Sequence, residues 1–146
     1  MFGKVMIYIT FGIICMVTAI IDIQKQKIYN ETVAALFVPA IVSFFVFPEI
    51  SMISRLLGAI TVSGGMLLAC LFVPGSFGGG DIKFMIPVGF MLGLEGAWRA
   101  GMLAIFFAGG WCLMIMGRKE KKFPFGPSLC MGSFVALVML DVHIIQ

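Results

Sequence analysis

The sequence predicts an all-α membrane protein, a single domain of about six transmembrane helices that covers residues 1–146. The first observation is composition: 61% of the residues are hydrophobic and only 12% are charged, whereas a soluble domain carries about 25% charged residues. The second is that polar breaks divide the chain into six apolar runs. Because one crossing takes about 20 residues, this length accommodates one bundle and leaves no room for a separate soluble domain.

Each apolar run predicts one helix. The runs cover residues 5–22, 32–47, 56–73, 82–94, 97–116 and a last stretch that ends near residue 145. Pro39 predicts a kink in the second helix, and Gly58, Gly64 and Gly65 predict that a neighbour packs closely on the third. The fourth run is too short to cross comfortably. We expect the glycines before it to lie within the membrane depth, in non-helical backbone that lines a wet cavity.

Charge predicts how the chain is oriented. The net charge of +3 is small, and no basic patch is interleaved with aromatic residues, so no nucleic-acid partner is expected. When the loops alternate between the two sides, most basic residues fall on one side, which the positive-inside rule makes cytoplasmic. That side holds Lys25, Lys27, Lys83, Arg118, Lys119, Lys121 and Lys122, and the other holds Lys4, Arg55 and Arg99.

Cysteine and histidine usage argues against several kinds of chemistry. The four cysteines, at positions 15, 70, 112 and 130, lie singly within apolar runs, with no CxxC pair and no nearby histidine. We therefore expect no metal site and no cofactor. The single histidine lies near the end of the chain, which argues against a Ser-His or Cys-His nucleophile.

Two acids stand out in this apolar chain. Asp22 ends the first run and Asp81 precedes the fourth, so the alternating topology places both on the cytoplasmic face. An ionisable group within a membrane segment costs at least about 2.5 kcal/mol and is kept mainly where it pairs, lines a cavity or does chemistry. Asp22 would also face the negative end of its own helix dipole, which costs about 0.3–1 kcal/mol.

Structural readings of both acids remain open at this point. Asp22 could be a solvated loop residue paired with Lys25 or Lys27. Asp81 could cap the fourth helix, with Lys83 reaching outward. The three glycines at residues 78–80 allow positive φ and let a neighbouring backbone come close to the Asp81 carboxylate.

Two carboxylates that meet across a water molecule are what an aspartic peptidase requires. Two carboxylates at that separation cannot both ionise easily, so the pair shares one proton. One member then acts as base on the water while the other acts as acid toward the carbonyl oxygen. Asp22 and Asp81 are the candidates for this pair.

Three motifs give the sequence a family resemblance. Asp22 is followed by basic residues and Ile-Tyr-Asn at residues 28–30; Gly-Gly-Gly-Asp-Ile-Lys follows at residues 78–83, and Phe-Pro-Phe-Gly-Pro at residues 123–127. In this order and spacing the chain resembles the bacterial type IV prepilin peptidases, of the GxGD class of intramembrane aspartic peptidases. The resemblance implies a six-helix enzyme of the bacterial inner membrane that cuts the basic leader from prepilins or pseudopilins at the cytoplasmic face.

The resemblance also implies roles for particular residues. Asp22 and Asp81 match the catalytic pair. The residues that match the site-shaping positions are Asn30, Gly78, Gly79, Gly80, Lys83, Pro124, Gly126 and Pro127. Tyr29 replaces the proline that is common in the first motif. The CxxC pairs that many relatives carry before the first helix, associated with N-methylation, are not in this sequence, so we expect cleavage without methylation.

Two other functions are compatible with these residues. One is a small transporter in which Asp22, Asp81 and Lys83 relay protons or ions. The other is a noncatalytic assembly factor that binds pilins. The expected partners of the peptidase are the prepilin or pseudopilin and membrane lipid; the sequence leaves the oligomeric state open.

Overall fold

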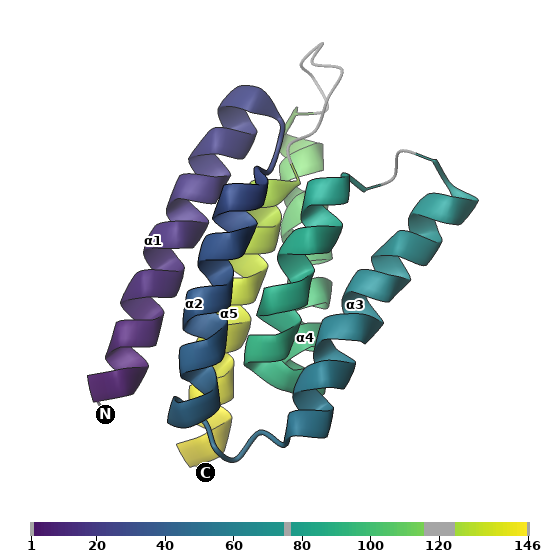
Figure 1. Ribbon diagram of the computed structural model, residues 1–146. Coiled ribbons are helices and arrows are strands. Elements are labelled where there is room, and N and C mark those ends of the chain that lie inside the picture. The colour runs from purple at the N-terminus through teal and green to yellow at the C-terminus, as the bar shows by residue number, and fades with distance from the viewer. Residues whose placement is uncertain (1, 75–76, 116–124, 146) are drawn as a thin grey trace.

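The computed structural model describes residues 2–74, 77–115 and 125–145, and these residues form helices and short connections without a strand (Figure 1). The helices are α1 (Phe2–Lys25), α2 (Asn30–Val46), α3 (Met52–Phe72), α4 (Gly79–Ile115) and α5 (Gly126–Ile145). The all-α prediction is therefore confirmed. The apolar exteriors of these helices are those of a polytopic membrane protein.

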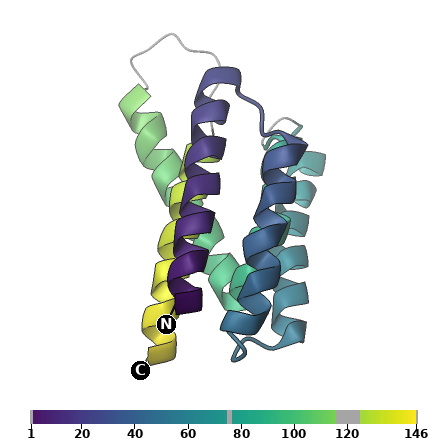
Figure 2. The ribbon, with the colours of Figure 1, turned by 60° about the vertical axis from the view of Figure 1, so that its left-hand side comes forward.

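The chain of α4 reverses its direction at Gly93, where φ is 71° and ψ is −178°. Figures 1 and 2 show that the second part of α4 runs back toward the end of the bundle at which the first part begins. The stretch Gly79–Met114 has the composition of one long span, but the reversal makes it two shorter ones. With these two parts the described chain has six helical segments, in agreement with the prediction of about six.

Glycine is required at the reversal for two reasons. A positive φ lies in the left-handed region, which strains residues that carry a Cβ. A Cβ at Gly93 would also lie 2.7 Å from Ile50 Cγ2 and 2.9 Å from Ser54 Oγ. The Ser54 hydroxyl accepts a hydrogen bond from the Leu94 N–H at 3.0 Å, which satisfies a donor that the broken helix leaves free. The sequence suggested a boundary at Glu95, and the break lies two residues earlier.

Arg55 joins three helices at the end of the bundle where this reversal occurs. Its side chain is 0% exposed and donates hydrogen bonds to carbonyl oxygens of Ser43 in α2, of Phe47 directly after α2, and of Phe90 and Met91 in α4. These carbonyls lie where α2 and the first part of α4 end, which is the negative end of each helix dipole. The Ser43 carbonyl also accepts the Phe47 N–H, whereas the usual helical partner of the Phe90 carbonyl, the Leu94 N–H, is bonded to Ser54 instead. From the sequence, Arg55 was predicted only as a charged residue on the side of the membrane away from the aspartates.

Small residues decide where the helices come close. A Cβ at Gly58 would lie 2.5 Å from the Gly89 carbonyl oxygen, and one at Gly89 would lie 2.3 Å from that of Gly58. At this point α3 and α4 cross in backbone contact, as the sequence predicted for Gly58. The prediction is wrong for Gly64 and Gly65, because a Cβ at either would have no atom within 4 Å.

The arrangement brings six helix ends together at one end of the bundle. The C-terminal ends of α1, α3 and α4 lie there with the N-terminal ends of α2, α4 and α5, while the chain termini lie at the other end (Figures 1 and 2). This is the alternation that the sequence predicted, and it places both Asp22, near the end of α1, and Asp81, in the first turn of α4, at the same end.

Candidate active site

Asp22 lies in the last turn of α1 and is only 5% exposed. One carboxylate oxygen, Oδ2, accepts a hydrogen bond of 2.9 Å from the backbone N–H of Gly126, the first residue of α5. The first N–H groups of a helix lack helical partners and carry the positive end of the dipole. The unfavourable interaction of the Asp22 carboxylate with the dipole of α1 is thus offset by a favourable one with the N-terminus of α5. The sequence alone did not indicate this second helix end.

Asp81 is the third residue of α4 and is 8% exposed. Its Oδ2 accepts a hydrogen bond of 3.1 Å from the N–H of Gly78, the residue before the helix. This is the back-bonding half of a capping box, in which the third helical residue reaches back to the N-cap N–H. The capping interpretation is therefore partly right: Asp81 is not the N-cap residue, but it does stabilise the start of its helix.

The two aspartates line one cavity of about 390 Å³. The structure also brings to this cavity several of the residues that the sequence singled out. The lining comprises Asp22, Gln26, Lys27, Ile28, Asn30, Gly78, Gly79, Gly80, Asp81 and Lys83. Gln26, Lys27 and Ile28 were not predicted as site residues, although their place between the first aspartate and Asn30 could have suggested them.

Among the three glycines of residues 78–80, small size matters most at Gly80. A Cβ at Gly80 would lie 2.7 Å from Ile28 Cβ, so only glycine lets the connection between α1 and α2 pack against α4. At Gly79 an added Cβ would have no neighbouring atom within 4 Å. Gly79 and Gly80 are helical, and Gly93 is the one glycine with positive φ among the described residues. The expectation of positive φ is therefore wrong for all three glycines, and the expectation of non-helical backbone holds only for Gly78.

Lys83 and Asn30 meet at the mouth of the cavity. The Lys83 Nζ donates a hydrogen bond of 3.2 Å to Asn30 Oδ1, and both residues are exposed. This contact joins the start of α2 to the first turns of α4. Because the pair is exposed, its contribution to stability is small, but it sets a cation and an amide beside the carboxylates.

The lysines near Asp22 have another partner. The Lys25 and Lys27 ammonium groups lie 5.5 Å and 5.7 Å from the centre of the Tyr29 ring, within the range of cation–π contacts. Among the described residues, neither lysine forms an ion pair with Asp22. The interpretation of Asp22 as a solvated loop residue paired with one of these lysines is therefore not what the structure shows.

The entry to α5 completes the site. Gly126 and Pro127 are buried, whereas Pro124 lies outside the described residues. The Phe125 ring contacts the Phe77 ring edge to face, with 5.3 Å between centroids. A Cβ at Gly126 would lie 2.6 Å from Asp22 Oδ2, so this position admits only glycine if the carboxylate keeps its place. Within the described residues no cluster of three or more His, Cys, Asp or Glu side chains could hold a metal ion.

The fold and this site define a helical membrane protein with two buried carboxylates in one cavity. The chain belongs to the type IV leader peptidase family, whose sequence model matches residues 9–116 and so contains both aspartates. Among known proteins it is similar to the prepilin leader peptidase/N-methyltransferase of Bacillus subtilis (strain 168), with 29% identity over 140 residues. That alignment covers 91% of this chain and 55% of the relative, so the chain spans about half of the relative's length. No solved structure matches the chain significantly.

Proposed function

We propose that this protein is a membrane-embedded aspartic endopeptidase that removes the basic leader from type IV prepilins or pseudopilins, with Asp22 and Asp81 as its catalytic pair. One observation carries the proposal: the two buried aspartates line the same cavity, and each has one oxygen held by a glycine N–H. The family of the chain supports peptidase chemistry. The relative from Bacillus subtilis supports the substrate class.

The hydrogen bonds orient the carboxylates for hydrolysis. Each N–H takes up the Oδ2 atom, which leaves Oδ1 of each residue free to bind a shared water molecule. Hydrogen bonds to a charged group contribute about 1.5–3 kcal/mol. Because both donors are backbone groups at the starts of helices, they hold the carboxylates in place without the freedom of a side chain.

The reaction follows from one proton shared by the pair. The ionised carboxylate removes a proton from the water, whose oxygen attacks the carbonyl carbon of the scissile peptide bond. The protonated carboxyl group donates its proton to the carbonyl oxygen, which gives a tetrahedral intermediate. When this intermediate collapses, the C–N bond breaks and the leaving nitrogen takes a proton from the first carboxyl group, while the second, now ionised, carboxylate takes a proton from one hydroxyl of the intermediate as the carbonyl group re-forms. The pair thereby returns to its singly protonated state.

We place the catalytic end at the cytoplasmic face of the bacterial inner membrane. Lys25, Lys27 and Lys83 lie near the aspartates at this end of the bundle, and the positive-inside rule favours the cytoplasm for such residues. A prepilin with a basic leader and an apolar stem would hold its leader at the membrane surface. Its scissile bond would then reach the depth of the two aspartates.

Cleavage of a full-length prepilin in detergent micelles tests the proposal. We expect the wild-type chain to cut, and Asp22→Asn or Asp81→Asn to lower kcat by about 10²–10⁴-fold or more, since each removes general acid–base chemistry. Asparagine keeps an oxygen that can accept the glycine N–H, so both variants should stay folded. If folded variants cut at the wild-type rate, the catalytic assignment is wrong.

The same preparations separate the other two functions. A transporter would conduct protons in proteoliposomes and lose this flux in the asparagine variants without cutting any peptide. An assembly factor would bind the prepilin and leave its leader attached. Either outcome with the wild-type chain would replace the peptidase proposal.

A further inference from the structure

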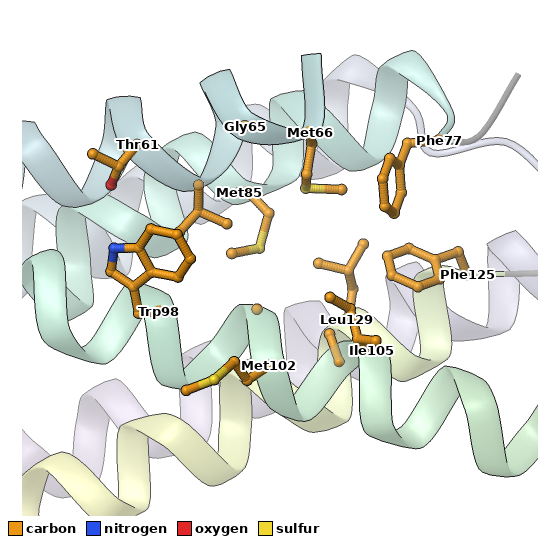
Figure 3. Close-up of a pocket in the computed structure, with 13 residues that line it drawn as sticks. Thr61, Gly65, Met66, Phe77, Met85, Trp98, Met102, Ile105, Phe125 and Leu129 are labelled. Carbon is orange, nitrogen blue, oxygen red and sulfur yellow. The ribbon is translucent and has the colours of Figure 1, made fainter. Parts of the chain in front are cut away.

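A second cavity, of about 220 Å³, lies beside the catalytic site and is almost wholly apolar. It is lined by residues of α3, both parts of α4 and the start of α5, and it is open on one side (Figure 3). Figure 3 shows Phe77 and Phe125 together at one end of it and Thr61 and Trp98 at the other, so the cavity runs along the helices. Gly65 and Met102 face one another from its two sides.

The cavity exists because α3 separates from the rest of the bundle. Beyond the close crossing at Gly58, the two helices are further apart: a Cβ added at Gly64 or Gly65 would have no neighbouring atom within 4 Å. Figure 1 shows that α3 diverges from α4, and that the two helices are furthest apart at the end of the bundle that holds the aspartates. Large apolar side chains on this part of the helix, such as Leu71 and Phe72, are exposed. The opening therefore faces the surrounding membrane.

The two phenylalanines connect this cavity to the catalytic pair through the backbone. The N–H that binds Asp81 belongs to the peptide bond between Phe77 and Gly78, and the N–H that binds Asp22 belongs to the peptide bond between Phe125 and Gly126. The Phe77 and Phe125 rings touch one another and line the cavity. A group that pushes on these rings thus acts on both carboxylates.

We propose that this cavity binds side chains of the apolar helix that follows the scissile bond in the prepilin, and that contact with Phe77 and Phe125 sets the two carboxylates for cleavage. The inference rests on the proposed peptidase function. Three observations favour such a helix as the occupant: the cavity ends at Phe77 and Phe125, next to the glycines that bind the two aspartates, it is open to the membrane, and its length follows the bundle axis.

The volume of the cavity and the flexibility of the side chains in its wall agree with an apolar helix as the occupant. The volume of 220 Å³ is smaller than the roughly 300–1,000 Å³ of a small-molecule site, and suits a few side chains from one face of a helix. Met66, Met85 and Met102 in its wall are unbranched and can adapt to different stems. Such a wall suits an enzyme that accepts several prepilins with different apolar sequences.

Photocrosslinking with a matched pair of variants tests the inference. The probe is a synthetic prepilin peptide with its basic leader and the following apolar helix, which carries photoactivatable leucine at successive positions. It is irradiated with the full chain in its Asp81→Asn form, and crosslinks are mapped by mass spectrometry. We expect crosslinks on Met66 or Met102, from probe positions three or four residues apart.

Gly65→Leu fills the cavity and Gly64→Leu is its control. Neither position has an atom within 4 Å of a built Cβ, and both variants gain the same helix propensity, but Gly64 does not line the cavity. We expect Gly65→Leu to reduce the crosslink yield at least about fivefold and Gly64→Leu to leave it within about twofold. Equal yields in both variants, or crosslinks confined to the outer faces of α1 and α2, would overturn the inference.

Kinetics separate this inference from the proposed function. With active enzyme, Gly65→Leu should lower kcat/KM about tenfold for the full probe and leave a probe without the apolar helix unaffected. A chain that crosslinks as expected but cuts neither probe would refute the peptidase and keep the binding site. If a photoactivatable phospholipid labels the cavity and the prepilin probe does not displace it, an acyl chain is the occupant and the inference is wrong.

Discussion

A single methyl group at Gly126 should weaken the proposed catalytic pair. In Gly126→Ala the added Cβ would lie 2.6 Å from Asp22 Oδ2, 2.8 Å from its Cγ and 2.9 Å from its Cβ. Backbone and carboxylate must therefore separate by about 0.4 Å even to reach 3.0 Å, which is still a very close contact. The same movement lengthens the hydrogen bond of 2.9 Å between the Gly126 N–H and Oδ2.

The expected loss follows from that hydrogen bond. A hydrogen bond to a charged group contributes about 1.5–3 kcal/mol, and each 1.36 kcal/mol corresponds to a factor of about ten in rate. Gly126→Ala should thus lower kcat/KM about 10- to 100-fold. Catalytic groups must be held to within about 0.5 Å of their working positions, so the displacement falls at the limit that catalysis tolerates.

The assay is cleavage of a prepilin in micelles, together with thermal unfolding of each variant. Gly109→Ala is the matched control, because a Cβ there has no atom within 4 Å and the residue lies in a helix outside the catalytic cavity. The control should keep its activity and unfold at the wild-type temperature or slightly above. A folded Gly126→Ala variant with wild-type kcat/KM would show that the Gly126 hydrogen bond does not position Asp22.

Two further variants probe the framework by thermal unfolding in detergent. Arg55→Met should destabilise the fold by at least about 2 kcal/mol, because it removes buried charged hydrogen bonds to the end of α2 and leaves the Phe90 carbonyl, whose usual helical donor bonds Ser54, without a partner. Gly80→Ala should cost about 1–3 kcal/mol, because its Cβ would lie 2.7 Å from Ile28 Cβ and must displace the connection between α1 and α2.

Each of these changes has its own control. Arg99→Met removes a partly exposed arginine whose partner is Glu95 one turn away, and should cost less than about 1 kcal/mol. An Arg55→Met variant as stable as Arg99→Met would contradict the role assigned to Arg55. In Gly79→Ala the added methyl group has free space, so this variant should stabilise the start of α4 slightly. Equal unfolding temperatures for Gly80→Ala and Gly79→Ala would mean that Ile28 can move aside without loss of stability.

The helices and their alternation were predictable because they depend on apolar length alone. Six apolar runs predicted six helical segments, and the positions of Asp22 and Asp81 at a common end followed from the alternation. The turn within α4 was also predictable in outline, since a second apolar run follows the fourth. Its location at Gly93 was not, because it depends on contacts with Ile50 and Ser54 from a distant part of the sequence.

The environment of each aspartate could not be deduced from local sequence. Asp22 appeared misplaced at the negative end of α1, and only the fold shows that the N-terminus of α5, 104 residues further along, lies against it. The glycines before Asp81 suggested unusual backbone angles, whereas Gly80 is required for its small size, because Ile28 lies against it across the cavity. In both cases the decisive partner belongs to another helix end.

The burial of Arg55 has a consequence for how the protein enters the membrane. Its acceptors include Phe90 and Met91, which are synthesised well after Arg55 itself. Until they emerge, the arginine in the first turn of α3 has only its acceptors at the end of α2. We therefore expect α3 to reach its final position only after the first part of α4 has been made, when Arg55 gains the rest of its partners.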